Sequence, residues 1–185
     1  MPNIEVRRDE ANGKIWSHVR SKWLVETPEE TVRQTYLLVL TNEYGFHVDQ
    51  IGEELQLIGR GSAGARADFV IWRTSQDKVD NKAPFIVVEC KSDNVTIKPV
   101  DYSQGETYSR ICDAPFFVTH NSRETRYWRV KKDMVPGYTE EIENIPHPIL
   151  ATQRLRNCYP NFAYSKKKSS RTSCIHATTQ FETLK

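Results

Sequence analysis

Two acids and a lysine stand at the ends of two apolar segments in the middle of the chain. Asp68 comes directly before the run Phe69–Trp72, and Glu89 and Lys91 close the run that begins at Phe85. Unpaired charge at the end of a buried strand is costly. Such charges indicate either an internal ion pair that only holds a sheet together, or a site that needs a carboxylate and an ammonium group side by side. A metal-dependent nuclease has a site of the second kind.

Phosphodiester hydrolysis explains why these residue types would be needed together. A divalent cation neutralises the charge that gathers on the phosphate, and Mg²⁺ prefers carboxylate oxygens and retained waters. Asp68 and Glu89 would hold the metal, together with the backbone carbonyl of Cys90, which lies between Glu89 and Lys91. Lys91 would orient the attacking water and stabilise negative charge as the bond forms. The expected cofactor is therefore Mg²⁺, with Mn²⁺ as a substitute.

The elements that would position these residues can be predicted from local patterns. A helix is expected from the N-cap Thr27 and the helix-starting Pro28 to a stop near Gly45. Alternation and apolar runs predict three strands, a second helix, and then one or two more strands. The three strands are expected over 51–58, 67–73 and 84–90, the helix over 101–113, and the later strands over 115–120 and 126–132.

Short turns between the first three strands predict antiparallel neighbours, including a polar turn over 75–82. The fourth strand follows a helix and should pair in parallel by a right-handed crossover. The fold class is therefore α/β, with a mixed central sheet flanked by helices. If 67–73 and 84–90 form a hairpin, the start of one strand lies beside the end of the other, so Asp68 should lie near Glu89 and Lys91.

The pattern resembles the PD-(D/E)xK nuclease superfamily: Asp68, a gap of about twenty residues, and Glu89-Cys90-Lys91, within the order helix, three strands, helix, strand. It is similar in particular to the nuclease domain of type I restriction enzyme R subunits, over roughly residues 22–130. The segments that carry this resemblance are TPEETVRQ, YGF, ARADFVIW, IVVECKSD, DYSQGETYSR and FFVTHN. The resemblance implies a restriction-endonuclease-like fold and a Mg²⁺-dependent DNA endonuclease of a restriction-modification system.

The resemblance also implies further site residues. Glu30 in the first helix would support the metal site, and Gln104 and Tyr108, which match a Q-x-x-x-Y motif, would flank the active site and the DNA. Each has a structural alternative. Glu30 could complete a capping box with Thr27, and Gln104 and Tyr108 are one helical turn apart and could simply contact each other. The same spacing predicts a surface ion pair between Glu29 and Arg33.

Two departures from the family pattern bear on function. Ala67 stands where the family name has proline, which is a common variation, and no G-x-x-x-x-G-K-[ST] motif for an ATP-driven motor occurs. The expected partners are DNA and the motor (ATP-dependent translocase), specificity and methyltransferase subunits of a restriction-modification complex. An alternative function is a DNA-binding or assembly module that is silent as a nuclease alone and works only with motor or methyltransferase partners.

The GRGSAG segment precedes a strand rather than a helix, so it predicts a hairpin loop and not a nucleotide site.

Composition bounds the remaining possibilities. Residues 1–150 carry 19 Lys and Arg against 23 Asp and Glu, whereas 151–185 carry seven against one. Overall charge therefore does not indicate a DNA-binding core. We expect one nuclease-like domain over 1–139, with an extension before about residue 22, and a basic, poorly patterned tail over 140–185. That tail could be a solvated arm with non-specific DNA affinity, or a truncated or frame-shifted end. Short apolar runs, no signal peptide and four scattered cysteines favour a cytoplasmic protein without a membrane span.

Overall fold

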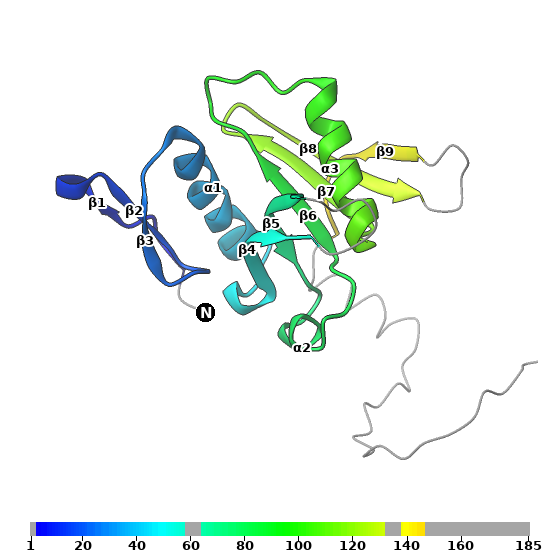
Figure 1. The fold of residues 1–185 in the computed structure, drawn as a ribbon, viewed down its shortest axis with the longest axis horizontal. Helices are drawn as coiled ribbons and strands as arrows, with labels where there is room; N and C mark the ends of the chain where they lie inside the picture. The colour runs from blue at the N-terminus through cyan, green and yellow to red at the C-terminus, as the bar shows by residue number, and fades with distance from the viewer. Residues whose placement is uncertain (1–2, 58–63, 132–137, 147–185) are drawn as a thin grey trace, which may run out of the picture.

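The computed structural model describes residues 3–57, 64–131 and 138–146, which form two sheets and three helices (Figure 1). A three-stranded sheet contains β1 (Arg8–Asp9), β2 (Lys14–Ser17) and β3 (Lys22–Val25). A six-stranded sheet contains β4 (Ile51–Gln56), β5 (Arg66–Ile71), β6 (Ile86–Cys90), β7 (Phe116–Asn121), β8 (Glu124–Lys131) and β9 (Tyr138–Ile142), in that spatial order. The helices are α1 (Pro28–Leu38), α2 (Ser75–Val79) and α3 (Pro99–Cys112), and single helical turns cover Glu10–Asn12, Val39–Glu43 and Val48–Gln50.

The topology of the large sheet follows the sequence prediction. β4, β5 and β6 are antiparallel neighbours, and β6 pairs with β7 in parallel after the α3 crossover. β7, β8 and β9 continue as an antiparallel meander. The predicted α/β class with a mixed central sheet and flanking helices is confirmed.

Each face of the large sheet is covered by one helix, and each interface holds a separate apolar cluster. On the α1 side, Tyr36, Leu37 and Leu40 pack against apolar residues of β4 to β7 such as Phe69 and Val88. Figure 1 shows α1 between the small sheet and the large one, and α3 on the other side of the large sheet. The cluster on the α3 side contains Ala67, Val70, Val87, Ala114, Phe117 and Val130. Burial on both faces explains why β6 is a continuous apolar run rather than an alternating one.

Helix α1 begins with the predicted N-cap, but only one of the two hydrogen bonds of the predicted capping box is formed. The Thr27 hydroxyl accepts a hydrogen bond from the backbone N–H of Glu30 at 3.1 Å, and Pro28 occupies the first turn. The Glu30 side chain does not return to the Thr27 backbone, whose N–H bonds to the Val25 carbonyl instead. A capping box is therefore not formed, and the Glu30 carboxylate is available for other contacts.

Gly105 in the interior of α3 has a packing reason. A Cβ atom at this position would lie 2.6 Å from Cδ2 of Phe117, a fully buried ring of β7. The absent side chain lets α3 approach the sheet closely, which brings the first turns of the helix near the end of β6. Gly105 thus helps to place Gln104 close to the candidate site.

Three features differ from the sequence expectations or extend them. The segment before residue 28 contains the small antiparallel sheet, and its Ile15 and Ser17 are fully buried. The polar turn expected over 75–82 begins with the short helix α2, because the Thr74 hydroxyl accepts from the Asp77 N–H. β9 continues the sheet to Ile142, beyond the expected boundary at residue 139.

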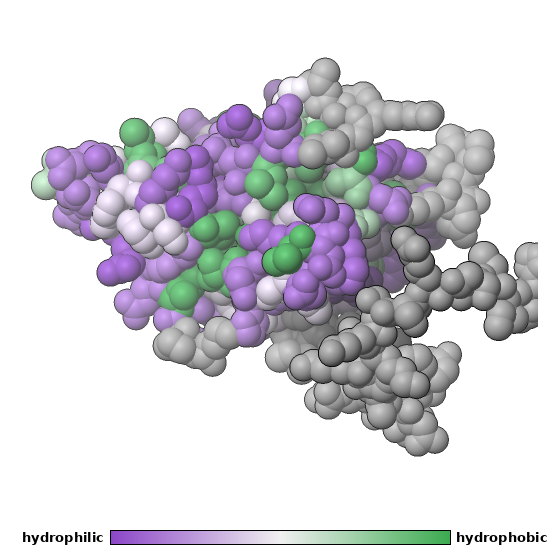
Figure 2. Space-filling view, turned by 60° about the horizontal axis from the view of Figure 1, so that its bottom comes forward, coloured by the Kyte–Doolittle hydropathy of each residue, from purple (hydrophilic) through white to green (hydrophobic). Residues whose placement is uncertain are grey.

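Other expectations fall outside the described residues. These are residues 59–63 of the GRGSAG loop, and residues 147–185 of the basic tail expected over 140–185. Among the residues that the structure describes, none of the helices has the length and hydrophobicity needed to cross a bilayer. The face shown in Figure 2 is mostly hydrophilic, with hydrophobic side chains in small patches between polar ones.

Candidate active site

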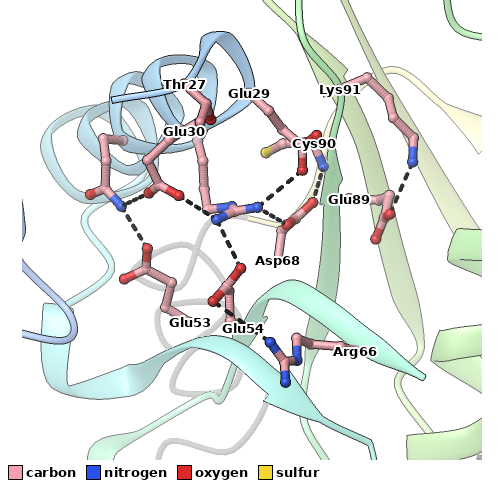
Figure 3. Close-up of polar contacts among 12 residues, drawn as sticks. Thr27, Glu29, Glu30, Glu53, Glu54, Arg66, Asp68, Glu89, Cys90 and Lys91 are labelled. Carbon is pink, nitrogen blue, oxygen red and sulfur yellow. Dashed lines mark hydrogen bonds and ion pairs between the residues drawn. The ribbon is translucent and has the colours of Figure 1, made fainter. Parts of the chain in front are cut away.

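The candidate site forms where β5 begins and β6 ends. The ladder between these strands runs from the pair Ile71–Ile86 to the pair Phe69–Val88, so the next residues in register are Asp68 and Glu89. There the backbone pairing stops, and the Cys90 N–H donates to Oδ2 of Asp68 at 2.7 Å. A side-chain carboxylate thus replaces a ladder partner, which fixes Asp68 against β6 (Figure 3).

Lys91 connects β6 to α3. Its ammonium group lies 3.1 Å from Oε1 of Glu89, 3.2 Å from Oε1 of Gln104 and 3.8 Å from Oδ1 of Asp101. The Gln104 amide nitrogen donates to the hydroxyl of Tyr108 at 2.9 Å. Gln104 and Tyr108 do contact each other, as their spacing allowed, and Gln104 also holds Lys91. The structure therefore joins four of the expected site residues in one chain of contacts.

Arg33 holds the other half of the site. Its Nη2 lies 2.6 Å from Oδ1 of Asp68 and 3.1 Å from Glu29, and its Nη1 lies 2.6 Å from Glu30 and 3.3 Å from Glu54. The Arg33 side chain is only 5% exposed. The predicted pair with Glu29 exists, but it is the outer edge of a buried network rather than an isolated surface contact (Figure 3).

Glu54 reaches Arg33 because of an unusual backbone conformation. Its φ is 49°, in the left-handed region that residues with a side chain rarely adopt. The ladder pairs on either side of it, Glu53–Phe69 and Leu55–Ala67, place Glu54 opposite Asp68. Arg20, in the turn between β2 and β3, binds the other Glu54 oxygen at 2.7 Å. The small sheet is thereby linked to the edge of the site.

Burial raises the pKa of both acids of the strand pair. Burial, and next the charge of Asp68, raise the pKa of Glu89 to about 7, against the pull of Lys91. Burial also raises the pKa of Asp68, although Arg33 and the Cys90 N–H favour its charged form. Burial disfavours the charge on Lys91, but Glu89 and Asp101 outweigh it and raise the pKa of the ammonium group. Burial thus disfavours the charged form of both carboxylates, although Arg33 and Lys91 pair with them.

Comparison with known proteins identifies the family. The family model for the N terminus of type I restriction enzyme R proteins matches residues 28–146. The chain belongs to this family. Comparisons with curated proteins and with solved structures give no significant match. The match extends from α1 to the residues after β9, so it contains the candidate site, whereas the small sheet precedes it. The expected relationship to restriction enzyme R subunits is confirmed at this level, and the chain is a restriction-system module.

The residues present in this family member are chemically suited to a divalent cation. Oε2 of Glu89 is buried and has no hydrogen-bond partner among the described residues, while its Oε1 is bound by Lys91. Within the described ranges, no group of three or more His, Cys, Asp or Glu side chains is arranged so that it could hold a metal ion. A cation at Asp68 and Glu89 would therefore have to retain several waters, as Mg²⁺ commonly does. Glu30 does not belong to that pair, because its oxygens are bound by Arg33 and Gln34.

A separate cleft of about 610 Å³ lies elsewhere on the molecule. Its walls come from β4, β5, α2 and the C-terminal end of α3, and include Leu57, Trp72 and Ile111. It contains none of the expected site residues. The candidate site, at the ends of β5 and β6, is thus not part of this cleft.

Sequence reasoning missed three residues of the site network: Arg33 as its centre, Glu54 and Asp101. From the spacing of acids near Arg33 in the sequence, only an ion pair with Glu29 was predicted. For Asp101 the signal was available, because it lies one turn before Gln104 on the helix that carries the Q-x-x-x-Y motif. Nothing local to Glu54 indicates its turned backbone.

Proposed function

We propose that this chain is a Mg²⁺-dependent DNA endonuclease module of a restriction system, with PD-(D/E)xK chemistry. The observation that carries the proposal is the meeting of Asp68 with Glu89 and Lys91 at one sheet edge, where a buried Glu89 oxygen has no partner among the described residues. Structural ion pairs would account for Glu89 with Lys91 and for Asp68 with Arg33. They would not account for the second oxygen of Glu89, which is buried without a hydrogen-bond partner among the described residues and so raises the free energy of the metal-free protein.

Each side chain has a distinct role in the proposed reaction. Asp68, Glu89 and the Cys90 carbonyl hold the cation, which when bound would neutralise charge on the scissile phosphate. Lys91 holds the attacking water and stabilises the negative charge that develops on the phosphoryl oxygens. Gln104 accepts from the Lys91 ammonium group and keeps it aimed, and Tyr108 fixes the Gln104 amide. Glu30 acts on Asp68 only through Arg33.

Cleavage of supercoiled plasmid tests the proposal directly. The protein should produce nicked or linear DNA with Mg²⁺ or Mn²⁺ and none with EDTA, and Asp68→Ala and Lys91→Ala should abolish the activity. Glu106→Gln is the matched control, because Glu106 also lies on α3 but, among the described residues, forms an ion pair with the surface residue Arg110 and with no residue of the site. Equal cleavage by the wild type and both site variants would show that the observed activity comes from another site or protein.

A second candidate is a module that is silent as a nuclease until DNA and partner subunits are supplied. The family is defined as the N terminus of a larger R protein, and Asp68 is held by Arg33 in this structure. Mn²⁺ binding measured by calorimetry separates this candidate from a module that lacks a working site. If the module is silent alone but has a working site, the wild type binds Mn²⁺ in the millimolar range or tighter and Glu89→Gln abolishes this binding. The wild type then cuts plasmid only when motor, specificity and methyltransferase subunits are added.

A further inference from the structure

Arg33 is a buried cation at the centre of a cluster of acids beside the site. Four carboxylates from α1, β4 and β5 lie within 3.3 Å of its two terminal nitrogens. An arginine guanidinium is not deprotonated in proteins, so Arg33 carries a positive charge inside this cluster.

The contacts of Arg33 occupy an atom that a cation at Asp68 would need. Oδ2 of Asp68 accepts from the Cys90 N–H, and Oδ1 is in close contact with Nη2 of Arg33 at 2.6 Å. A guanidinium and a divalent cation repel each other strongly across such a short distance in a buried site. Both can bind Asp68 at once only if they share its oxygens at close range.

The other partners of Arg33 can hold its guanidinium in place without Asp68. Glu29, Glu30 and Glu54 contact the guanidinium without touching Asp68 in the same network. If the contact with Asp68 loosens, these three acids still compensate the positive charge of Arg33. A buried arginine that lost all its partners would instead destabilise the fold strongly.

We propose that Arg33 is the built-in counter-ion of Asp68 in the metal-free protein, and that it competes with the divalent cation for this carboxylate. The inference rests on the proposed function. Arg33 compensates the charge of Asp68 when no metal is bound and weakens metal affinity. Metal binding loosens the Arg33–Asp68 contact, while Glu29, Glu30 and Glu54 retain the guanidinium. Arg33 is in this sense a positioning residue that does not touch the substrate.

Calorimetric titration with Mn²⁺ alone, together with thermal unfolding in EDTA, tests the inference without any activity assay. Arg33→Gln should bind Mn²⁺ about tenfold more tightly than the wild type, because the repulsion is removed. Its metal-free Tm should fall by roughly 10 °C, because a buried ion pair is broken, and Mn²⁺ should restore more of the Tm than in the wild type. Arg110→Gln, an exposed arginine of α3 paired with Glu106, is the matched control and should change neither quantity.

The outcomes distinguish this inference from the proposed function. Equal or weaker Mn²⁺ binding by Arg33→Gln, when Glu89→Gln abolishes binding, would overturn the competition and leave the metal site intact. Absence of Mn²⁺ binding in the wild type would overturn both. If Arg33→Gln does not fold, side-chain ¹⁵N spectra of the wild type decide: Mg²⁺ should shift the Arg33 Nη resonances, and no change upon saturation would contradict the inference.

Discussion

Replacing Glu89 by glutamine should stabilise the metal-free protein while it removes the proposed activity. Glu89 is 5% exposed, and burial together with Asp68 raises its pKa from 4.5 to about 7. Each pH unit of such a shift corresponds to about 1.4 kcal/mol. The ionised form of Glu89 therefore costs the folded state about 3 kcal/mol, which a neutral amide of nearly the same shape avoids. We expect Glu89→Gln to raise the free energy of unfolding by about 2–3 kcal/mol at pH 8 in EDTA.

The gain should depend on pH in a defined direction. A carboxyl whose folded pKa is raised binds its proton more tightly in the folded state, so its ionisation destabilises the fold as pH rises from 4.5 through about 7. The free energy of unfolding of the wild type relative to Glu89→Gln should be lowest above pH 7. The two proteins should converge as pH falls toward 4.5. Other groups titrate in both proteins, so the difference between the two curves isolates Glu89.

Urea denaturation in EDTA between pH 5 and pH 8.5 measures this difference. Glu106→Gln is the control, because loss of a partly exposed carboxylate paired with Arg110 should change the free energy of unfolding by no more than about 0.5 kcal/mol at any pH. A Glu89→Gln protein that is less stable than the wild type at pH 8 would refute the reasoning. It would mean that the ion pair with Lys91 stabilises the folded protein by more than the burial of Glu89 and its repulsion by Asp68 destabilise it. Glu89 would then have a structural role.

Three further predictions concern the packing and hydrogen bonds around the site. Gly105→Ala should lower the free energy of unfolding by about 1 kcal/mol in urea titrations, because a clash with the Phe117 ring outweighs the helix propensity gained from alanine; greater stability would contradict the close packing of α3. Tyr108→Phe should reduce plasmid cleavage about tenfold by freeing the Gln104 amide, with Tm within about 2 °C of the wild type. Asn121→Ala should lower the free energy of unfolding by about 2–3 kcal/mol in the same titrations. The buried Asn121 side chain makes three hydrogen bonds to the backbone of the loop before α3 and of the β7–β8 turn. An unchanged urea midpoint would show that water replaces these bonds.

The part of the site that could be predicted from sequence is the part fixed by neighbouring strands. Asp68 and Glu89 are separated by a short connection between two apolar runs, so antiparallel pairing alone brings them into register. Gln104 and Tyr108 were expected at the site only from the resemblance to a Q-x-x-x-Y motif, because their spacing alone predicted no more than a contact with each other. The parallel pairing of β6 and β7 explains why α3, which carries them, crosses over beside these strands.

The Arg33 network was not predictable in this way. Its spacing to Glu29 fits a helical surface pair, and the partners that bury it, Glu54 and Asp68, come from two strands far along the chain. The same holds for the small sheet, whose strands of two to four residues are too short for a reliable alternation pattern. Tertiary packing, rather than local sequence, decides both.

The conformation of Glu54 connects these two unpredicted features. A non-glycine residue in the left-handed region costs about 1–3 kcal/mol and persists only where its surroundings compensate for it. Here the compensation comes from Arg33 on one side and from Arg20 of the small sheet on the other. Ser17, also from that sheet, donates a hydrogen bond to the neighbouring Glu53. The strand that faces Asp68 is thus held in shape by residues that precede the family match, so the N-terminal extension takes part in forming the site.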